Sequence, residues 1–154
     1  MASTLKLPAK VFVDSSVLIA AAISLRVSAR ELLNAGILGR CHLFASRLVL
    51  AESEHNISRK APAALAMFEL FEEALAPTIV RPSKERVLEV ACVVELKDAP
   101  IVAGAMEAGA AYLATYDKQH LLNVAEQIQD AFGIIVLTPS AILRLTEDGP
   151  GGYR

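Results

Sequence analysis

Four acidic residues occupy positions from which their side chains could bind one metal ion. Two of them directly follow short apolar runs that are typical of buried strands, one lies on a predicted helix, and one stands where a helix is predicted to begin. They are Asp14, Glu52, Asp98 and Asp117. Carboxylates that converge repel one another unless a divalent cation neutralises them. Such a site is suited to phosphodiester hydrolysis by metal-activated water.

Each acid also has a plainer structural explanation. Asp14 and Asp117 suit a turn or a helix cap after a strand, and Asp98 is a favourable N-cap. Glu52 lies on a predicted helix, where a glutamate is most often solvated, and Glu54 on another face of that helix is its natural comparison. The arrangement of the four acids is therefore more informative than any one of them.

The elements that must position these acids alternate between strand and helix. Strands are predicted at residues 11–13, 41–45, 78–80, 112–115 and 134–137. Helices are predicted at residues 17–24, from 28 onward, and at 46–58, 63–75, 84–95, 98–108, 121–132 and 140–146. This alternation predicts a three-layer α/β/α fold around a mostly parallel, five-stranded sheet. In open sheets of this kind, sites form beyond the carboxyl ends of the strands.

Local signals predict where several of these helices begin. Ser28 and Glu31 have the spacing of a capping box, and Ser46 and Ser83 are predicted N-caps. Asp98 is predicted to cap the helix that follows it, and a proline two residues later is early enough in that helix to be tolerated.

Composition limits the classes of protein to consider. The chain has 154 residues, of which 54% are apolar, so one globular domain is predicted over residues 10–146, with a flexible N-terminus at 1–9 and a disordered tail at 147–154. The formal net charge of −2 does not by itself indicate nucleic-acid binding. It does not exclude it, because a metal and a few local cations can bind phosphate.

The sequence predicts no membrane contact. The longest apolar run, residues 17–23, is far shorter than the roughly 18–20 residues that a membrane span needs. Residues 1–10 lack the apolar core and cleavage site of a secretory signal. Cys41 and Cys92 are not closely spaced and are interpreted as reduced core thiols of a cytoplasmic protein.

The order of the four acids resembles that of the PIN-domain family, the VapC-like metal-dependent ribonucleases. The resemblance covers most of the chain and rests on four segments. They are residues 11–19, Ser46 with Glu52 six residues later, residues 97–105, and residues 112–117. The last two segments, with a helix rich in alanine and glycine between their aspartates, are the most specific.

The resemblance implies a site and a chemistry. Its acidic metal ligands would be Asp14, Glu52, Asp98 and Asp117, and the hydroxyls that hold the carboxylates in place would be Ser15, Ser16 and Thr115. Carboxylates and water are hard ligands suited to Mg²⁺ or Mn²⁺. The implied activity is endonucleolytic hydrolysis of RNA that leaves a 5′-phosphate and a 3′-hydroxyl.

The chain departs from the family pattern at two places. Ser16 stands where many members carry asparagine, so its contact is expected to be weaker or mediated by water. Gln119 and His120 occupy a stretch where the family often has a further acid, so a complete second metal position is not implied. The three histidines form no zinc pattern. His120 is close to Asp117 and could contact phosphate, although a surface or turn position explains it more readily.

Candidate contacts to a substrate are few. Lys97, Lys118 and Arg47 adjoin the acidic positions and are candidates for binding phosphates, although each is equally explained as a solvated cation. Only Tyr112 and Tyr116 are aromatic residues near the site, so no base-stacking platform is predicted.

The resemblance also implies partners. Many similar short chains are the toxin of a toxin–antitoxin pair, held inactive by a small antitoxin protein, and many form homodimers. Apolar residues on the predicted helices at 63–75 and 84–95 would allow a dimer, although core packing explains them equally well.

Two other functions use a similar fold. A catalytically silent PIN-like module would bind or scaffold without needing the acids, all four of which are present here. A flavodoxin-like phosphoacceptor would phosphorylate Asp14, but the partner motifs of such proteins are missing.

Overall fold

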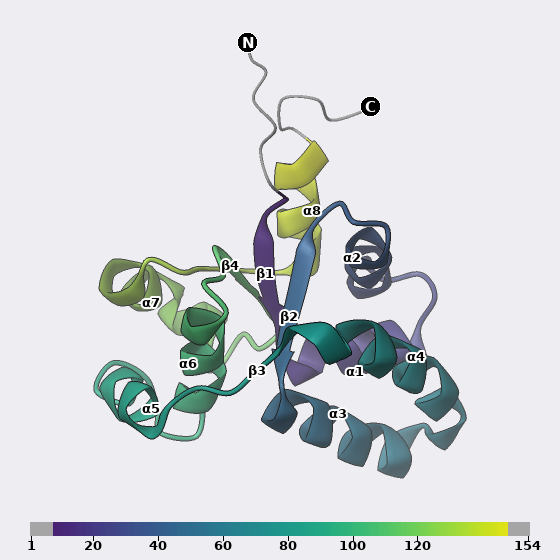
Figure 1. The fold of residues 1–154 in the computed structure, drawn as a ribbon, viewed down its shortest axis with the longest axis horizontal. Helices are drawn as coiled ribbons and strands as arrows, with labels where there is room; N and C mark the ends of the chain where they lie inside the picture. Colours follow the sequence, from purple (N-terminus) through teal and green to yellow (C-terminus); the bar gives the residue numbers. More distant parts are fainter. Residues whose placement is uncertain (1–7, 148–154) are drawn as a thin grey trace.

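A central parallel sheet organises the molecule. The computed structural model describes residues 8–147. Its strands are β1 (Lys10–Val13), β2 (His42–Ser46), β3 (Ile79–Val80), β4 (Tyr112–Ala114) and β5 (Ile135–Leu137). They form one sheet in the order β3-β2-β1-β4-β5, and every neighbouring pair is parallel. The predicted five-stranded sheet is therefore confirmed (Figure 1).

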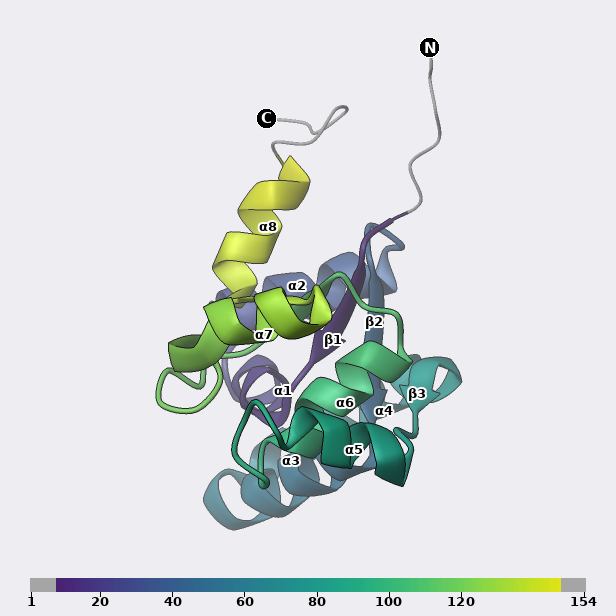
Figure 2. The ribbon, with the colours of Figure 1, turned by 90° about the vertical axis from the view of Figure 1, so that its left-hand side faces the viewer.

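Helices cover both faces of the sheet. They are α1 (Ser15–Ile23), α2 (Ser28–Ile37), α3 (Arg47–Lys60), α4 (Leu65–Leu75), α5 (Lys84–Val90), α6 (Ala99–Glu107), α7 (Ala125–Phe132) and α8 (Pro139–Glu147). Helices α5, α6 and α7 lie on one side, and α1, α2 and α4 lie on the other (Figures 1 and 2). None of the helices among the described residues is both long enough and apolar enough to cross a bilayer.

Several helix ends differ from the predictions. The N-cap of α2 is Val27, and no side chain caps it, so the capping box predicted at Ser28 does not form. Helix α5 ends at Val90 and not near Glu95, because hydrogen bonds from Cys92 N–H to Glu89 and from Val93 N–H to Val90 tighten the chain into turns. The predicted caps Ser46 and Ser83 are confirmed, since each hydroxyl accepts a backbone N–H of its helix.

Two of the long predicted helices begin with a tighter turn. A 3₁₀ turn over Pro62–Ala64 precedes α4, and another over Leu122–Val124 precedes α7. The termini predicted to be flexible or disordered lie largely outside the described residues, namely 1–7 and 148–154.

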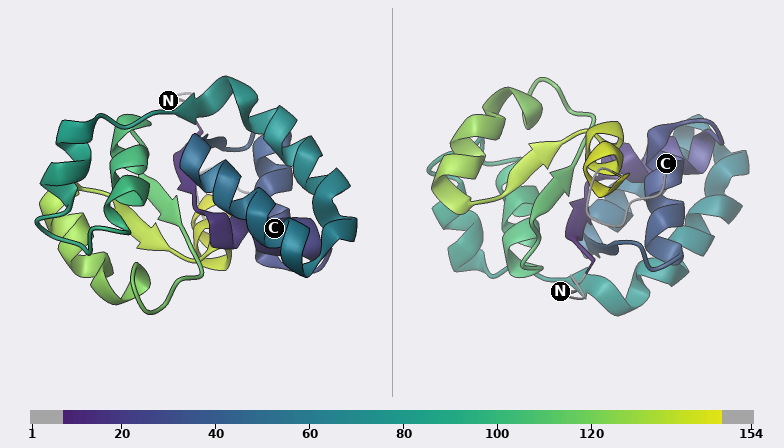
Figure 3. Two further views of the ribbon diagram at one scale, coloured as in Figure 1. Left: turned by 90° about the horizontal axis from the view of Figure 1, so that it is seen from below. Right: turned by 90° about the horizontal axis from the view of Figure 1, so that it is seen from above.

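The strand register brings distant acidic residues to one edge of the sheet. Val13 pairs with Ala114, and the N–H of Asp14 donates to the Ala114 carbonyl at 3.2 Å. The residues that follow β1 and β4 are therefore neighbours, although they are far apart in sequence. The left panel of Figure 3 views the molecule from the side on which these strands end.

Small residues let α6 approach the sheet closely. Its residues Ala99, Ala103 and Ala105 are fully buried, and Gly104 lies directly against the ring of Phe12, which is 0% exposed on β1. A Cβ atom placed on Gly104 would lie 2.8 Å from Phe12 Cζ. This packing fixes the start of α6, and with it Asp98, relative to the end of β1.

The two cysteines differ in exposure. Cys41 is buried as predicted, and burial raises the pKa of its thiol from 9.0 to about 11. Cys92 is exposed, so its interpretation as a core thiol was wrong. It lies in the turns that follow α5, where the helix had been expected to continue.

We expect this difference to be visible in thiol chemistry. Cys92 should react with a thiol reagent at pH 8, while Cys41 should react at least roughly tenfold more slowly, because only an accessible thiolate is nucleophilic. A colour assay with a thiol-specific disulfide reagent should count one fast thiol in the native protein and two in urea. Two fast thiols in the native protein would contradict the burial of Cys41.

Candidate metal centre

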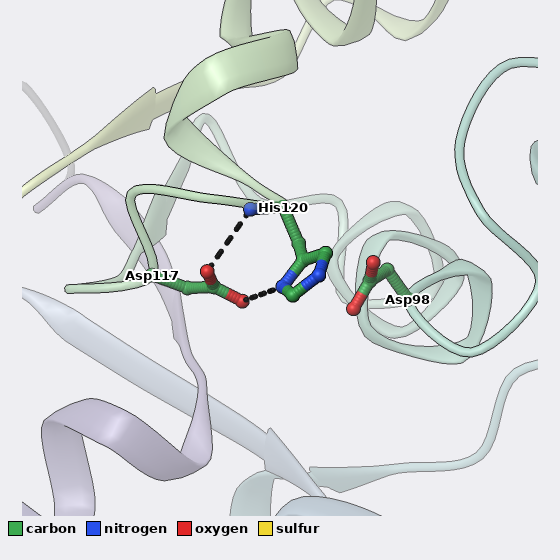
Figure 4. A group of neighbouring side chains, drawn as sticks. All are labelled: Asp98, Asp117 and His120. Atoms are coloured by element: carbon green, nitrogen blue, oxygen red, sulfur yellow. Dashed lines mark hydrogen bonds and ion pairs between the residues drawn. The ribbon is translucent and has the colours of Figure 1, made fainter.

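Three potential metal ligands converge at the carboxyl edge of the sheet. Asp98, Asp117 and His120 each offer one ligand atom, and these atoms all lie within 4.8 Å of one another. Figure 4 shows the His120 ring between the two carboxylates. It is the only such group of acidic, histidine or cysteine residues among the side chains that the structure describes. The structure thus brings together two of the four predicted acids and adds a histidine.

Asp98 stands at the N-cap of α6 but does not cap the helix with its side chain. No backbone N–H of the helix donates to its carboxylate. Its Oδ2 atom is buried and has no hydrogen-bond partner. Burial raises the pKa of Asp98, with the charges of His120 and Lys97 lowering it in part. A buried carboxylate oxygen without a partner is unfavourable in the absence of a ligand, so capping does not explain this residue.

Asp117 shapes the turn that presents His120. Its Oδ1 accepts hydrogen bonds from the backbone N–H groups of Gln119 at 3.1 Å and His120 at 3.0 Å. Its Oδ2 lies 3.4 Å from His120 Nδ1, and each of the two side chains is 30% exposed. His120 lies in a turn, as expected, and this turn also brings its ring to Asp117. The signal that could have found it is its i+3 spacing from Asp117, which a turn of this kind converts into contact.

Asp14 lies beside this group and is held by hydrogen bonds. It is 5% exposed. Its Oδ1 accepts from Ser16 Oγ at 2.6 Å and from Val17 N–H at 3.2 Å, and its Oδ2 accepts from Thr115 Oγ1 at 2.5 Å. Burial raises the pKa of Asp14, these hydrogen bonds lower it, and the negative charge of Asp117 raises it further.

Two hydroxyls connect β1 and β4 at this point. Thr115 Oγ1 donates to Asp14 and accepts from the Asp117 N–H at 2.9 Å, so one hydroxyl positions both acids. Ser16 Oγ accepts from the Tyr116 N–H at 2.9 Å while donating to Asp14. The expectation of a weaker or water-mediated contact at Ser16 was wrong, because the serine reaches its partners directly.

Glu52 is linked to the start of α1. Ser15 Oγ donates to Glu52 Oε2 at 3.2 Å, which links the start of α1 to the middle of α3. Glu52 is exposed, and neither Glu52 nor Asp14 belongs to the close group of three ligands. Ser15 therefore has the carboxylate partner that the sequence suggested, and Glu52 stays a predicted ligand.

The three candidate phosphate-binding cations occupy different surroundings. Lys97 Nζ lies 3.0 Å from His120 Nε2 and so contacts the centre directly. Lys118 is exposed. Arg47 is exposed at the first position of α3, beside a separate cavity.

Comparison with known proteins identifies the architecture. No family model and no curated protein matches the sequence. Solved structures do match. PAE2754 from Pyrobaculum aerophilum is 19% identical, with a TM-score of 0.57 over 89% of each chain. FitAcB from Neisseria gonorrhoeae is 16% identical, with a TM-score of 0.57 over 84% of this chain and 98% of that one. FitAB bound to an IR36 DNA fragment is 15% identical, with a TM-score of 0.56 over 84% and 94%. The chain has a PIN-like fold.

The donors at the carboxyl edge of this PIN-like fold suit a divalent cation. Two carboxylates and an imidazole supply oxygen and nitrogen donors within one small volume. The buried Asp98 oxygen lacks a partner, which a cation would provide. The charge of Asp117 raises the pKa of both Asp14 and Asp98, so the acids repel one another as metal-free groups. The residues present therefore fit such an ion.

Thr115→Val tests the hydroxyl that joins the two acids in the PIN-like fold. We expect the free energy of unfolding to fall by about 1–3 kcal/mol, because the buried Asp14 carboxylate and the Asp117 N–H each lose a partner. Urea unfolding at pH 7 would measure the loss. Thr115→Ser keeps the hydroxyl and should recover most of the stability. If Thr115→Ser, which keeps the hydroxyl, lost as much stability as Thr115→Val, the two hydrogen bonds of the hydroxyl would not explain the loss.

Proposed function

We propose that this protein is a divalent-metal-dependent nuclease of the PIN type that hydrolyses RNA phosphodiester bonds. The observation that carries the proposal is the group formed by Asp98, Asp117 and His120, in which a buried Asp98 oxygen has no partner. The group lies at the carboxyl edge of a parallel α/β sheet, where such folds place their sites. The PIN-like fold supports the same assignment.

The side chains of the centre would have different roles. Asp98, Asp117 and His120 would hold the cation, which when bound activates water and offsets phosphate charge. Asp14 would add a further carboxyl group beside them and is kept in place by Thr115 and Ser16. Among the predicted acids, this leaves Glu52 at the exposed side, where its carboxylate can face an incoming substrate.

The donor set favours some metals over others. Carboxylate oxygens suit Mg²⁺ and Mn²⁺, and an imidazole nitrogen is a better ligand for the softer Mn²⁺ than for Mg²⁺. We therefore propose Mn²⁺ or Mg²⁺ as the cofactor, with His120 favouring Mn²⁺.

The proposal extends to partners. The resemblance to VapC-like ribonucleases supports a toxin role with a small antitoxin protein in the cytoplasm. Exposed apolar residues on two helices, Leu70 on α4 at 56% and Leu88 on α5 at 57%, support a homodimer. A catalytically silent scaffold is the alternative, and no observation of the structure favours it.

Cleavage of a mixed panel of single-stranded RNAs tests the activity. Wild type would be assayed in EDTA, Mg²⁺ and Mn²⁺ beside Asp117→Asn and Glu52→Gln, and products would be analysed for 5′-phosphate ends. Glu54→Gln is the matched control, because Glu54 is exposed on the same helix as Glu52. We expect metal-dependent cleavage that is lost in Asp117→Asn, reduced in Glu52→Gln and unchanged in Glu54→Gln.

Two outcomes would argue against the proposal. Equal cleavage by wild type and Asp117→Asn would indicate a contaminating nuclease. If metal neither raises the melting temperature nor produces cleavage, the scaffold function becomes the better explanation.

A further inference from the structure

A small cavity lies on the same edge of the sheet as the acidic centre. It has a volume of about 180 Å³ and is lined by the start of α3, by the segment that follows β3 and by Pro100 of α6. Two of its lining residues, Arg47 and Arg81, are arginines with exposed side chains. We call this cavity, with these two residues, the arginine cleft.

The arginine cleft is a region of unpaired positive charge. Among the described residues, no carboxylate lies within 4.0 Å of either guanidinium group. No aspartate or glutamate is among the residues that line the cavity. An anion that entered it would therefore meet two cations and no opposing charge.

Backbone groups add to this preference. Arg47 is the first residue of α3, a helix of 14 residues. The first N–H groups of a helix lack partners within the helix and carry partial positive charge. Ser46 Oγ accepts the N–H of Val49, and the two residues before Val49, Arg47 and Leu48, both line the cleft.

The strand order places the cleft beside the acidic centre. Ser46 at the end of β2 pairs with Val80 at the end of β3, so Arg47 and Arg81 leave neighbouring strands side by side. The sheet order β3-β2-β1-β4 continues to Asp14 after β1 and Asp117 after β4. The carboxyl edge thus carries two arginines after β2 and β3 and two aspartates after β1 and β4.

Helix α6 connects the two regions directly. Pro100, which lines the cleft, is two residues after Asp98, which belongs to the acidic centre. The cleft and the acidic centre are therefore joined through the first turn of α6.

We propose that the arginine cleft binds a phosphate of the substrate strand next to the phosphate that reacts at the acidic centre. This inference rests on the proposed nuclease function and assigns its substrate-binding subsite. Arginine is suited to the role, because its planar guanidinium group binds phosphate oxygens in pairs. Lys97, a cation next to Asp98 in sequence, is already in contact with His120.

Binding of RNA without cleavage tests the cleft. Fluorescence anisotropy of a labelled single-stranded RNA would be measured in EDTA, so that the result does not depend on catalysis. We expect the Arg47→Ala/Arg81→Ala double variant to bind roughly tenfold more weakly. The slope of log affinity against log salt should fall by roughly 0.7, the value for one phosphate contact on a single strand.

A variant on the same helix provides the control. Arg59 is also exposed on α3 but lies in its last turn, away from the cleft. Arg59→Ala should bind RNA like wild type, and both proteins should keep the wild-type melting temperature. An equal loss of affinity in Arg59→Ala would reduce the effect to overall charge and overturn the proposal. Unchanged binding by the double variant would overturn it as well.

Two further measurements are needed. One distinguishes RNA from free inorganic phosphate as the ligand of the cleft, and the other distinguishes failure of the cleft proposal from failure of the nuclease proposal. Displacement of RNA by inorganic phosphate only at a large excess would support a nucleic-acid subsite, whereas tight phosphate binding by wild type with no RNA binding would overturn it. Loss of RNA affinity in the double variant would support the cleft even if no metal ever produced cleavage. The experiment can therefore reject the nuclease proposal and the cleft proposal independently.

Discussion

Asp98→Asn should stabilise the metal-free protein and abolish its stabilisation by Mn²⁺. The buried Asp98 oxygen has no partner, and burial raises the pKa of this carboxyl. A raised pKa means that the folded state binds the proton more tightly than the unfolded chain. Ionised Asp98 therefore lowers stability. This loss develops as pH rises from the usual carboxyl pKa of 3.8 through the raised value, and it is complete above that value.

In the presence of metal, we expect wild type to be more stable than Asp98→Asn. A ligand at 100 times its Kd stabilises the folded state by about 2.7 kcal/mol, and wild type should gain stability of this order in Mn²⁺ while the variant gains little. If RNA is the substrate, cleavage should fall more than roughly 100-fold, which exceeds the usual effect of removing a group that only supports a metal ligand.

Melting temperatures between pH 4 and pH 8, in EDTA and in Mn²⁺, would measure both effects. Glu95→Gln is the matched control, because Glu95 is an exposed acid whose charge also acts on Asp98 but which is outside the ligand group. Equal stabilisation of wild type and Asp98→Asn by Mn²⁺ would place the metal elsewhere.

Phe12→Ala should lower the free energy of unfolding by about 3–5 kcal/mol. The Phe12 side chain is fully buried at the centre of the sheet and fills the space beside Gly104, which has no side chain of its own. This loss is a large part of the roughly 5–15 kcal/mol that stabilises a typical domain. Urea unfolding at constant pH would measure it, with the slope of the transition checked for two-state behaviour.

A second variant tests the close approach of Gly104 to this ring. Gly104→Ala alone should destabilise wild type, because its Cβ would lie 2.8 Å from Phe12 Cζ. In a Phe12→Leu background those ring atoms are gone, and the same change should become neutral or stabilising, since alanine is favoured over glycine in a helix by about 1 kcal/mol. If Gly104→Ala changes the free energy of unfolding equally in the wild-type and Phe12→Leu backgrounds, the two residues are not in contact.

The sheet and its edge acids could be predicted because local rules and packing agree there. Runs such as Val11–Val13 are apolar on both faces, as buried parallel strands must be, and Ser46 and Ser83 mark helix starts by hydrogen bonds to their own helices. The ends of the helices were harder to predict from the sequence. The apolar residues after Val90 continue a helical pattern in sequence, but the backbone there closes into tighter turns.

The missed residues depend on three-dimensional neighbours. His120 becomes a candidate ligand only because the Asp117 turn directs its ring toward Asp98, which stands at the start of α6. Arg81 lines the same cavity as Arg47 only because β3 lies next to β2 in the sheet. The i+3 spacing relates His120 to Asp117, but its approach to Asp98 and that of Arg81 to Arg47 depend on elements that are distant in sequence. Asp14 and Asp117 could be predicted because each follows an apolar strand.

The hydrogen bond between Thr115 and Asp14 joins residues 101 positions apart, and this separation has a consequence during synthesis. A ribosome makes β1 and Asp14 early, but the centre lacks Thr115, Asp117 and His120 until β4 has left the exit tunnel and paired with β1. If the protein cleaves RNA, the nascent chain is inactive for most of its translation. The ribosome and the message it is reading are then spared by the order in which the strands are made.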